Sequence, residues 1–90
     1  MAIAAIIVKL MPDSPQVNLE NIKKESKSRL ENEGAKNISF EEKPIAFGLT
    51  AVMVKFAWQE EKSTDLVETT LSSIPEVSSV TIEDYRRAFG

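Results

Sequence analysis

The hydrophobic and polar positions along the chain predict strands in four places. Residues 4–11 are apolar at almost every position, which is typical of a central strand. Residues 37–43 alternate between apolar and polar side chains, as expected for a strand with one face toward the core. Residues 49–59 form the longest strand candidate, and residues 77–85 are expected to form the last strand. Residues 86–90 are then left as a short tail.

Between the first two strands, the spacing predicts an amphipathic helix. Its apolar stripe consists of Leu19, Ile22, Ser26 and Leu30. Asn18 is a suitable N-cap because its side-chain oxygen can accept a hydrogen bond from a free backbone N–H of the first turn. Gly34 is placed to end this helix, since glycine tolerates the left-handed conformation found after many helices.

A second helix is predicted between the last two strands. Its apolar stripe consists of Val67, Leu71 and Ile74, and Pro75 lies just past its end. The candidate N-caps are Ser63, Thr64 and Asp65. Asp65, followed three residues later by Glu68, also has the spacing of a capping box.

The order strand, helix, strand, strand, helix, strand indicates an α+β protein of one domain, residues 1–90. Right-handed crossovers place the first and third strands in the middle of a four-stranded antiparallel sheet, with both helices on one face. This is the ferredoxin-like β-α-β-β-α-β two-layer sandwich, a fold that hosts many functions.

The sheet face away from the helices is predicted to carry an apolar patch. Its members are Ile7, Met11, Ala51 and Met53. An uncovered patch of this kind usually marks a contact surface. The alternatives are that the stems of Lys9 and Lys55 cover part of it, or that a second copy does.

The connection between the second and third strands has an unusual composition. Pro44 and Gly48 are both backbone breakers, and the apolar residues Ile45, Ala46 and Phe47 lie between them. A turn needs no phenylalanine for its geometry. Phe47 is therefore either folded back to cover the end of the sheet or held out for a partner.

Composition excludes several kinds of chemistry. The chain has no cysteine and no histidine, which removes disulfides, thiol or histidine-assisted nucleophiles and the usual zinc sites. There is no P-loop, and no acidic residues fall at calcium-loop spacing, so no cofactor or metal is expected. The adjacent acids Glu83 and Asp84 should point to opposite faces of a strand and so should not form a catalytic pair.

Charge and hydropathy limit the kinds of partner and the cellular location that are expected. A net charge of −3 argues against nonspecific binding to nucleic acid. An RNA-binding sheet would need aromatic residues spaced two apart on its third strand, whereas Leu49 follows Phe47 at that spacing. The apolar run near the N-terminus is too short to span a membrane and has no basic region before it. We expect a cytoplasmic location and a monomer in the free state.

The chain resembles archaeal elongation factor 1-beta over essentially its whole length. The segments that carry the resemblance are Val8-Lys9-Leu10-Met11-Pro12, Pro44-Ile45-Ala46-Phe47-Gly48-Leu49 and the closing Val80-x-Ile82-x-Asp84-x-Arg86-Arg87. Eukaryotic relatives have a similar Pro-Ile/Val-Gly-Phe/Tyr-Gly-Ile segment in the C-terminal part of a longer protein. The mid-chain segment is the most specific of the three.

The resemblance implies a guanine-nucleotide exchange factor for the elongation factor 1-alpha GTPase, acting without covalent catalysis. It implies that the aromatic at Phe47 enters the GTPase, and that the neighbouring residues 44–48 bind this partner. In eukaryotic members a lysine near the C-terminus disturbs the magnesium and phosphate site. Here the tail has no lysine, and Arg86 and Arg87 are the nearest cations. Which of the two, if either, replaces the lysine stays open.

Two other functions are compatible with the residues alone. A small ferredoxin-like regulatory or ligand-binding domain would act through the open sheet face. An RNA-binding sheet would show salt-sensitive binding to oligonucleotides. The exchange factor is our preferred interpretation because it alone gives Phe47 a reason to lie in a loop.

Overall fold

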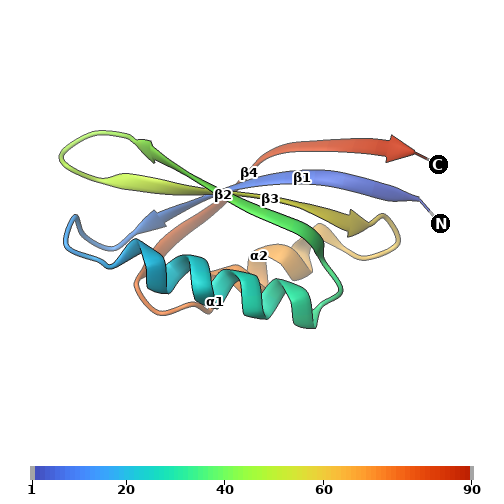
Figure 1. Cartoon of the computed structure of the whole chain (residues 1–90), viewed down its shortest axis with the longest axis horizontal. Coiled ribbons are helices and arrows are strands. Elements are labelled where there is room, and N and C mark those ends of the chain that lie inside the picture. The colour runs from blue at the N-terminus through green and yellow to red at the C-terminus, as the bar shows by residue number, and fades with distance from the viewer. Residues whose placement is uncertain (1, 90) are drawn as a thin grey trace.

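All six predicted elements are present in the computed structural model, which describes residues 2–89. The elements are β1 (Ile3–Pro12), α1 (Leu19–Asn32), β2 (Lys36–Pro44), β3 (Thr50–Gln59), α2 (Thr64–Ser72) and β4 (Val77–Phe89) (Figure 1). Except for β4, the observed ends lie close to the predicted ones. Hydrophobic patterning, together with the cap and breaker residues, was sufficient to locate these elements.

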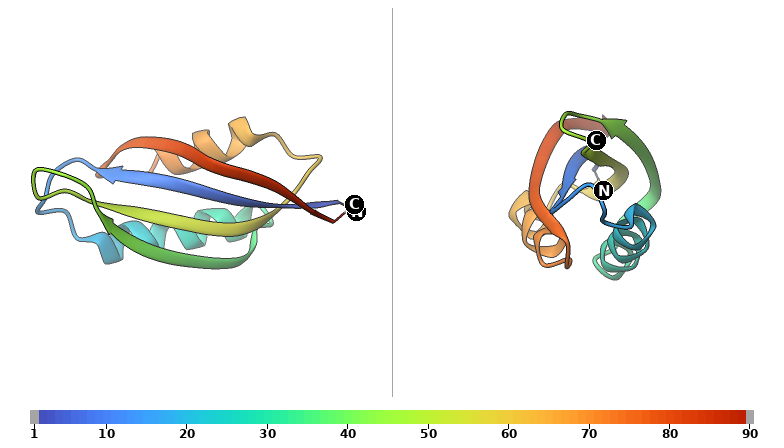
Figure 2. Two further views of the ribbon diagram at one scale, coloured as in Figure 1. Left: turned by 90° about the horizontal axis from the view of Figure 1, so that it is seen from above. Right: turned by 90° about the vertical axis from the view of Figure 1, so that its left-hand side faces the viewer.

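The strands form a four-stranded antiparallel sheet in the order β2-β3-β1-β4. The register places Ile6 opposite Phe56 and Val8 opposite Val54 in the two central strands. Both helices lie on one face of the sheet, which arches over them and leaves its other face open (Figure 2). The predicted ferredoxin-like sandwich is therefore confirmed.

The core lies between the sheet and the helices. Alternate residues of β1 and β3 are buried on this side, namely Ala4, Ile6, Val8, Leu10, Val52, Val54, Phe56 and Trp58. The helices contribute Ile22, Leu30, Val67 and Leu71. The Phe56 and Trp58 rings pack edge to face, with centroids 5.8 Å apart. Aromatic pairs favour this arrangement because the positive ring edge meets the negative ring face.

The helix N-termini are capped by side chains. Asn18 Oδ1 accepts a hydrogen bond from the Glu20 N–H at 3.0 Å, as predicted for α1. For α2 the N-cap is Ser63, whose Oγ accepts from the Asp65 N–H at 3.0 Å. The capping box with Asp65 as N-cap is wrong, because Ser63 is the extended residue and Asp65 already lies in the first turn.

β4 is longer than predicted, and the expectation of a tail from Arg86 onward is wrong for the described residues. Arg86 lies opposite Ala5 and Arg87 opposite Ala4, both within the ladder to β1. β1 already begins at Ile3, so the backbone N–H and C=O groups of Ala4 and Ala5 are available to pair with the two arginines. Two consecutive arginines do not alternate between apolar and polar side chains, so the sequence pattern did not predict a strand here. Gly90 lies outside the described residues.

An irregularity in the β1–β4 register changes the direction of one side chain. Ile7 lies opposite Asp84 and Val8 opposite Ile82, so Glu83 is an extra residue on β4. Glu83 Oε2 lies 3.9 Å from Lys9 Nζ on the open face, and Asp84 shares this face with its partner Arg86. The expectation that Glu83 and Asp84 point to opposite faces is therefore wrong. Each carboxylate has a cation beside it.

Candidate functional site

The β2–β3 hairpin ends in a turn with a defined backbone. The Leu49 N–H donates to the Ala46 carbonyl at 2.9 Å, and the Ile45 N–H donates to the Leu49 carbonyl at 2.9 Å. The two central residues, Phe47 and Gly48, have positive φ angles of 56° and 77°. Positive φ at both central positions is the mark of a type I′ turn, whose twist matches that of the flanking strands.

Phe47 is the most unusual residue of this turn. Its side chain is 95% exposed, so it is held out and does not cover the end of the sheet. The left-handed conformation costs an L-residue about 1–2 kcal/mol, and asparagine or glycine normally occupies this position. Phe47 therefore carries a backbone cost and gains little packing within the chain. Its side chain is available to a second molecule.

Other apolar residues surround Phe47 at this end of the molecule. Ile45 is 44% exposed, and Pro44 and Ala46 are also exposed. Pro15, in the loop between β1 and α1, lies beside the turn, since a Cβ on Gly48 would be 3.7 Å from the Pro15 Cβ. No local sequence pattern links this proline to a turn so far along the chain.

The two C-terminal arginines occupy adjacent positions of β4. Arg86 Nε lies 2.8 Å from Asp84 Oδ2, and Arg87 Nε lies 2.7 Å from Glu60 Oε1. The arginine side chains are nevertheless 79% and 80% exposed. Exposed ion pairs contribute little to stability, and this applies to Arg86 and Asp84. The Glu60 side chain is only 14% exposed, so departure of Arg87 would leave a largely buried carboxylate without its partner. Of the two guanidinium groups, that of Arg86 can therefore leave its carboxylate for another anion at the lower cost.

The predicted site residues fall into two separate groups. Residues 44–48 are together at the hairpin tip, whereas the arginines lie toward the end of the molecule that holds both termini (Figure 1). Thr50 beside the tip and Ala57, in line with Arg86, are seven positions apart on β3, about 23 Å of extended strand. The structure therefore does not bring Phe47 and Arg86 into one site.

The hairpin, the arginines and the fold all lie within the part of the chain that matches a known family. The EF-1 guanine nucleotide exchange domain matches residues 5–88. The chain belongs to this family. The match includes every residue of the hairpin tip and both arginines.

Several archaeal relatives in this exchange-domain family are similar along nearly their whole length. Elongation factor 1-beta of Methanothermobacter thermautotrophicus is 42% identical over 81 residues, which is 89% of this chain and 90% of the relative. Elongation factor 1-beta of Methanosphaera stadtmanae is 36% identical, over 97% of this chain and 98% of the relative. That of Methanocella arvoryzae is 38% identical, over 99% and 100%. The resemblance to archaeal elongation factor 1-beta is confirmed.

The open sheet face of this exchange domain is less apolar than predicted. Ala51 is fully buried, and Ile7, Met11 and Met53 are half-buried, so the expectation of four uncovered residues is wrong for Ala51. Lys9 is half-buried and lies on the same face of β1, between Ile7 and Met11. This position is compatible with the alternative that lysine stems cover part of the patch.

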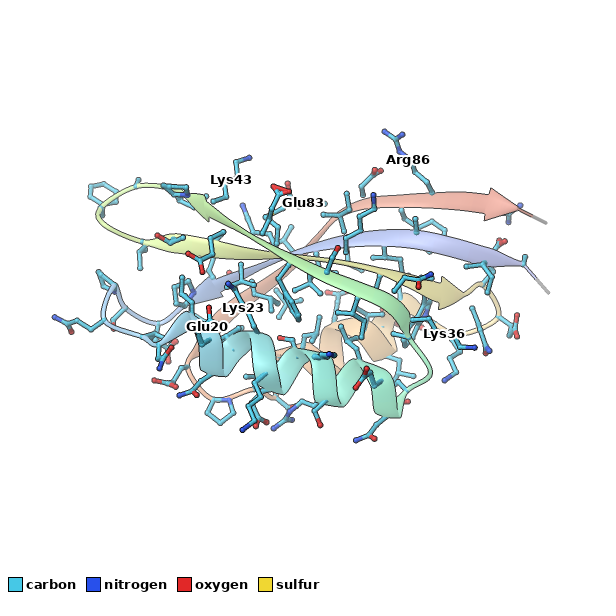
Figure 3. All side chains as sticks on the ribbon, viewed as in Figure 1. Glu20, Lys23, Lys36, Lys43, Glu83 and Arg86 are labelled. Atoms are coloured by element: carbon cyan, nitrogen blue, oxygen red, sulfur yellow. The ribbon has the colours of Figure 1, made fainter. Side chains whose placement is uncertain are left out.

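One lysine joins α1 to the hairpin. Lys23 Nζ donates to Glu42 Oε2 at 2.7 Å and to Glu20 Oε2 at 3.0 Å. These hydrogen bonds, that to Glu42 first, raise the pKa of Lys23 above its ordinary value because they favour the charged form. Lys23 projects from α1 toward β2 in Figure 3. The contact therefore holds β2, the first strand of the hairpin, against the helix layer.

The described residues offer little other chemistry. Among residues 2–89 no group of three or more acidic, cysteine or histidine side chains is arranged to hold a metal ion. Neither helix in that range is long and apolar enough to cross a membrane. The exposed hairpin tip and the two arginines are therefore the candidate functional residues.

Proposed function

We propose that the chain is a single exchange domain that promotes GDP/GTP exchange on the elongation factor 1-alpha GTPase during translation, in the cytoplasm. Family membership supports the exchange of guanine nucleotides. The observation that carries the proposal is Phe47, which is 95% exposed on a closed turn. An aromatic held at a backbone cost and without packing is typical of a residue that functions in contact with a partner.

Exchange of this kind requires only binding. A factor that binds the nucleotide-free GTPase more tightly than the nucleotide-bound form weakens nucleotide binding by the same factor, since coupling between two ligands is reciprocal. No covalent step and no cofactor is needed. The absence of cysteine and histidine from the sequence is compatible with this mechanism.

In this proposal the hairpin tip binds the GTPase through Phe47, with Pro44, Ile45, Ala46 and Gly48 beside it. Hydrogen bonds at 2.9 Å already order the turn, so little backbone entropy is lost on binding. Burying a phenylalanine that is exposed in the free protein contributes about 2–3 kcal/mol. That energy can hold open a conformation of the GTPase that the nucleotide disfavours.

Arg86 and Arg87 form the second contact of the proposal. Each would exchange its present carboxylate for an anionic group of the GTPase, such as a magnesium ligand or a phosphate. A cation brought close to bound magnesium weakens its binding by charge repulsion. The arginines and the tip would then contact the same partner at two separate points.

The test is the release of labelled GDP from elongation factor 1-alpha with and without this chain. We expect the wild-type chain to accelerate release and Phe47→Ala to reduce that acceleration about thirtyfold or more, because most of the phenyl burial energy of about 2–3 kcal/mol is lost and about 1.4 kcal/mol corresponds to a factor of ten. Circular dichroism and the fluorescence of the buried Trp58 check that the variant is folded.

Lys27→Ala, an exposed position on α1, is the matched control and should leave release unchanged. If a folded Phe47→Ala chain kept full activity, insertion of the Phe47 ring into the GTPase would not be part of the mechanism. A wild-type chain with no effect on release would overturn the exchange function itself.

A further inference from the structure

The open face of the sheet contains a groove that the hairpin residues do not account for. The groove measures ≈ 460 Å³ and includes Ile7 and Met53, both half-buried, among its lining residues. Lys43 and Pro44 of β2 and Lys55 of β3 also line it. It is therefore an apolar depression with charged side chains of both signs along its border, since Glu41 and Glu42 line it as well.

The groove is continuous with both groups of proposed partner-binding residues. Pro44 lines it and belongs to the hairpin tip. A second depression of ≈ 250 Å³ shares Ile7 and Lys55 with the groove and is also lined by Arg86. Lys43 and Arg86 project from the sheet on the side away from the helices (Figure 3). A partner that contacts both the tip and Arg86 must therefore pass over this face.

The charges at the groove favour an acidic occupant. Lys43 and Lys55 are exposed, and among the described residues neither has a carboxylate within 4.0 Å. Glu42, which also lines the groove, binds Lys23 on the helix side at 2.7 Å. Glu41 is the remaining acid of the lining. Glu41 lies opposite Met53 on this same face, between the positions of the two lysines. The groove thus has two ammonium groups without an ion-pair partner, one carboxylate between them and the apolar residues Ile7 and Met53 in its floor.

We infer that the open sheet face is part of the exchange interface. It binds a segment of the partner GTPase that presents an apolar side chain with a carboxylate on each side of it. The apolar side chain enters between Ile7 and Met53, and the carboxylates pair with Lys43 and Lys55, which lie four strand positions apart. This inference rests on the proposed exchange function. It assigns Lys43 and Lys55 to the interface, in addition to the tip and the arginines.

The experiment compares association rates with nucleotide-free elongation factor 1-alpha for the wild-type chain and a Lys43→Glu, Lys55→Glu double variant. We expect association to slow about tenfold at low salt, because border charges act chiefly on the association rate. The difference between the association rates of the wild-type chain and the double variant should become smaller as the salt concentration rises, because salt screens these charges. Lys24→Glu with Lys27→Glu, on the exposed face of α1, makes the same change in net charge and should slow association about twofold at most.

Two outcomes would overturn the inference. If the double variant associates as fast as the α1 control, the open face lies outside the interface. If the wild-type chain is a dimer, or binds an oligonucleotide, and the double variant abolishes that property while exchange is unchanged, the groove binds a second copy or RNA. Failure of the proposed function gives a different result, since the wild-type chain would then not accelerate GDP release.

Discussion

At the scale of single residues, Phe47 combines two features that rarely occur together. Its φ of 56° belongs to a region that bulky residues avoid, and its side chain is 95% exposed. Neither feature benefits the folded chain alone. In the proposed mechanism, stability and function therefore make opposite demands at this position.

A substitution should separate these two demands. Phe47→Asn places a residue that tolerates φ > 0 at the first central position of the turn, and the exposed ring contributes little to the core. We expect the free energy of unfolding to rise by about 1 kcal/mol. Acceleration of GDP release should fall as in Phe47→Ala. Urea unfolding followed by Trp58 fluorescence measures the first effect.

Phe47→Ala is the control for this prediction. Alanine keeps the strained backbone and loses the ring, so its stability should stay close to that of the wild type. If Phe47→Asn and Phe47→Ala unfold at the same urea concentration, the strain at this residue contributes nothing measurable.

At the scale of elements, the hairpin extends beyond the core but is attached to the helix layer close to its turn. Lys23 of α1 contacts Glu42 of β2, two residues before the strand ends at Pro44. The tip has an additional neighbour in Pro15 of the β1–α1 loop. Contacts from two other elements therefore position the turn that presents Phe47.

The Lys23 contact predicts a pH dependence. The pKa of Lys23 is raised in the folded chain from its ordinary value of 10.5. Its contribution is therefore complete below that value and is lost as pH rises through the higher folded pKa. Lys23→Met should lower the free energy of unfolding by about 0.5 kcal/mol at neutral pH, as is typical of a partly exposed pair. The difference from the wild type should disappear at strongly alkaline pH.

Urea unfolding of both chains across this pH range is the measurement. Lys27→Met, on the exposed face of the same helix, controls for the loss of one charge and should show no such trend. A Lys23→Met deficit that persists unchanged after the lysine has lost its proton would show that the ion pair is not responsible, since methionine keeps a similar apolar stem.

At the scale of the whole molecule, the two groups of proposed binding residues lie toward opposite ends of an elongated body. The principal extents are 41, 21 and 19 Å, and the strands run along the long direction (Figure 2). A rigid sheet with contacts at both ends and a groove between them can contact two distant points of one partner. A partner must then present two complementary sites at this same separation, so the spacing of the two contacts contributes to specificity.

This separation predicts independent effects of distant substitutions. Phe47→Ala and Arg86→Ala each remove one contact, and sites more than about 10 Å apart usually contribute additively to the free energy. The double variant should reduce the kcat/KM for GDP release by the product of the two single effects, within about twofold. A double variant no worse than Phe47→Ala alone would mean that Arg86 acts only when the tip is bound.

Much of the fold and part of the candidate site could be predicted from the sequence. The prediction that Ile7 and Met53 lie on the face away from the helices leaves Ile6 and Val8 for the core side, where they are buried, because successive residues of a strand point to opposite faces. The local chemistry of Pro44 and Gly48 also located the hairpin turn and marked Phe47 as unusual. These features depend on residues close together in the chain, so a local pattern suffices.

The tertiary structure decided what depends on distant partners. Pairing with β1 extended β4 through Arg86 and Arg87, and one extra residue in that ladder turned Glu83 to the open face. Folding also exposed Phe47, brought Pro15 beside the turn and separated the tip from the arginines. The physical reason is that ladder register and solvent exposure are set by contacts between segments far apart in the chain, which no local pattern of side chains records.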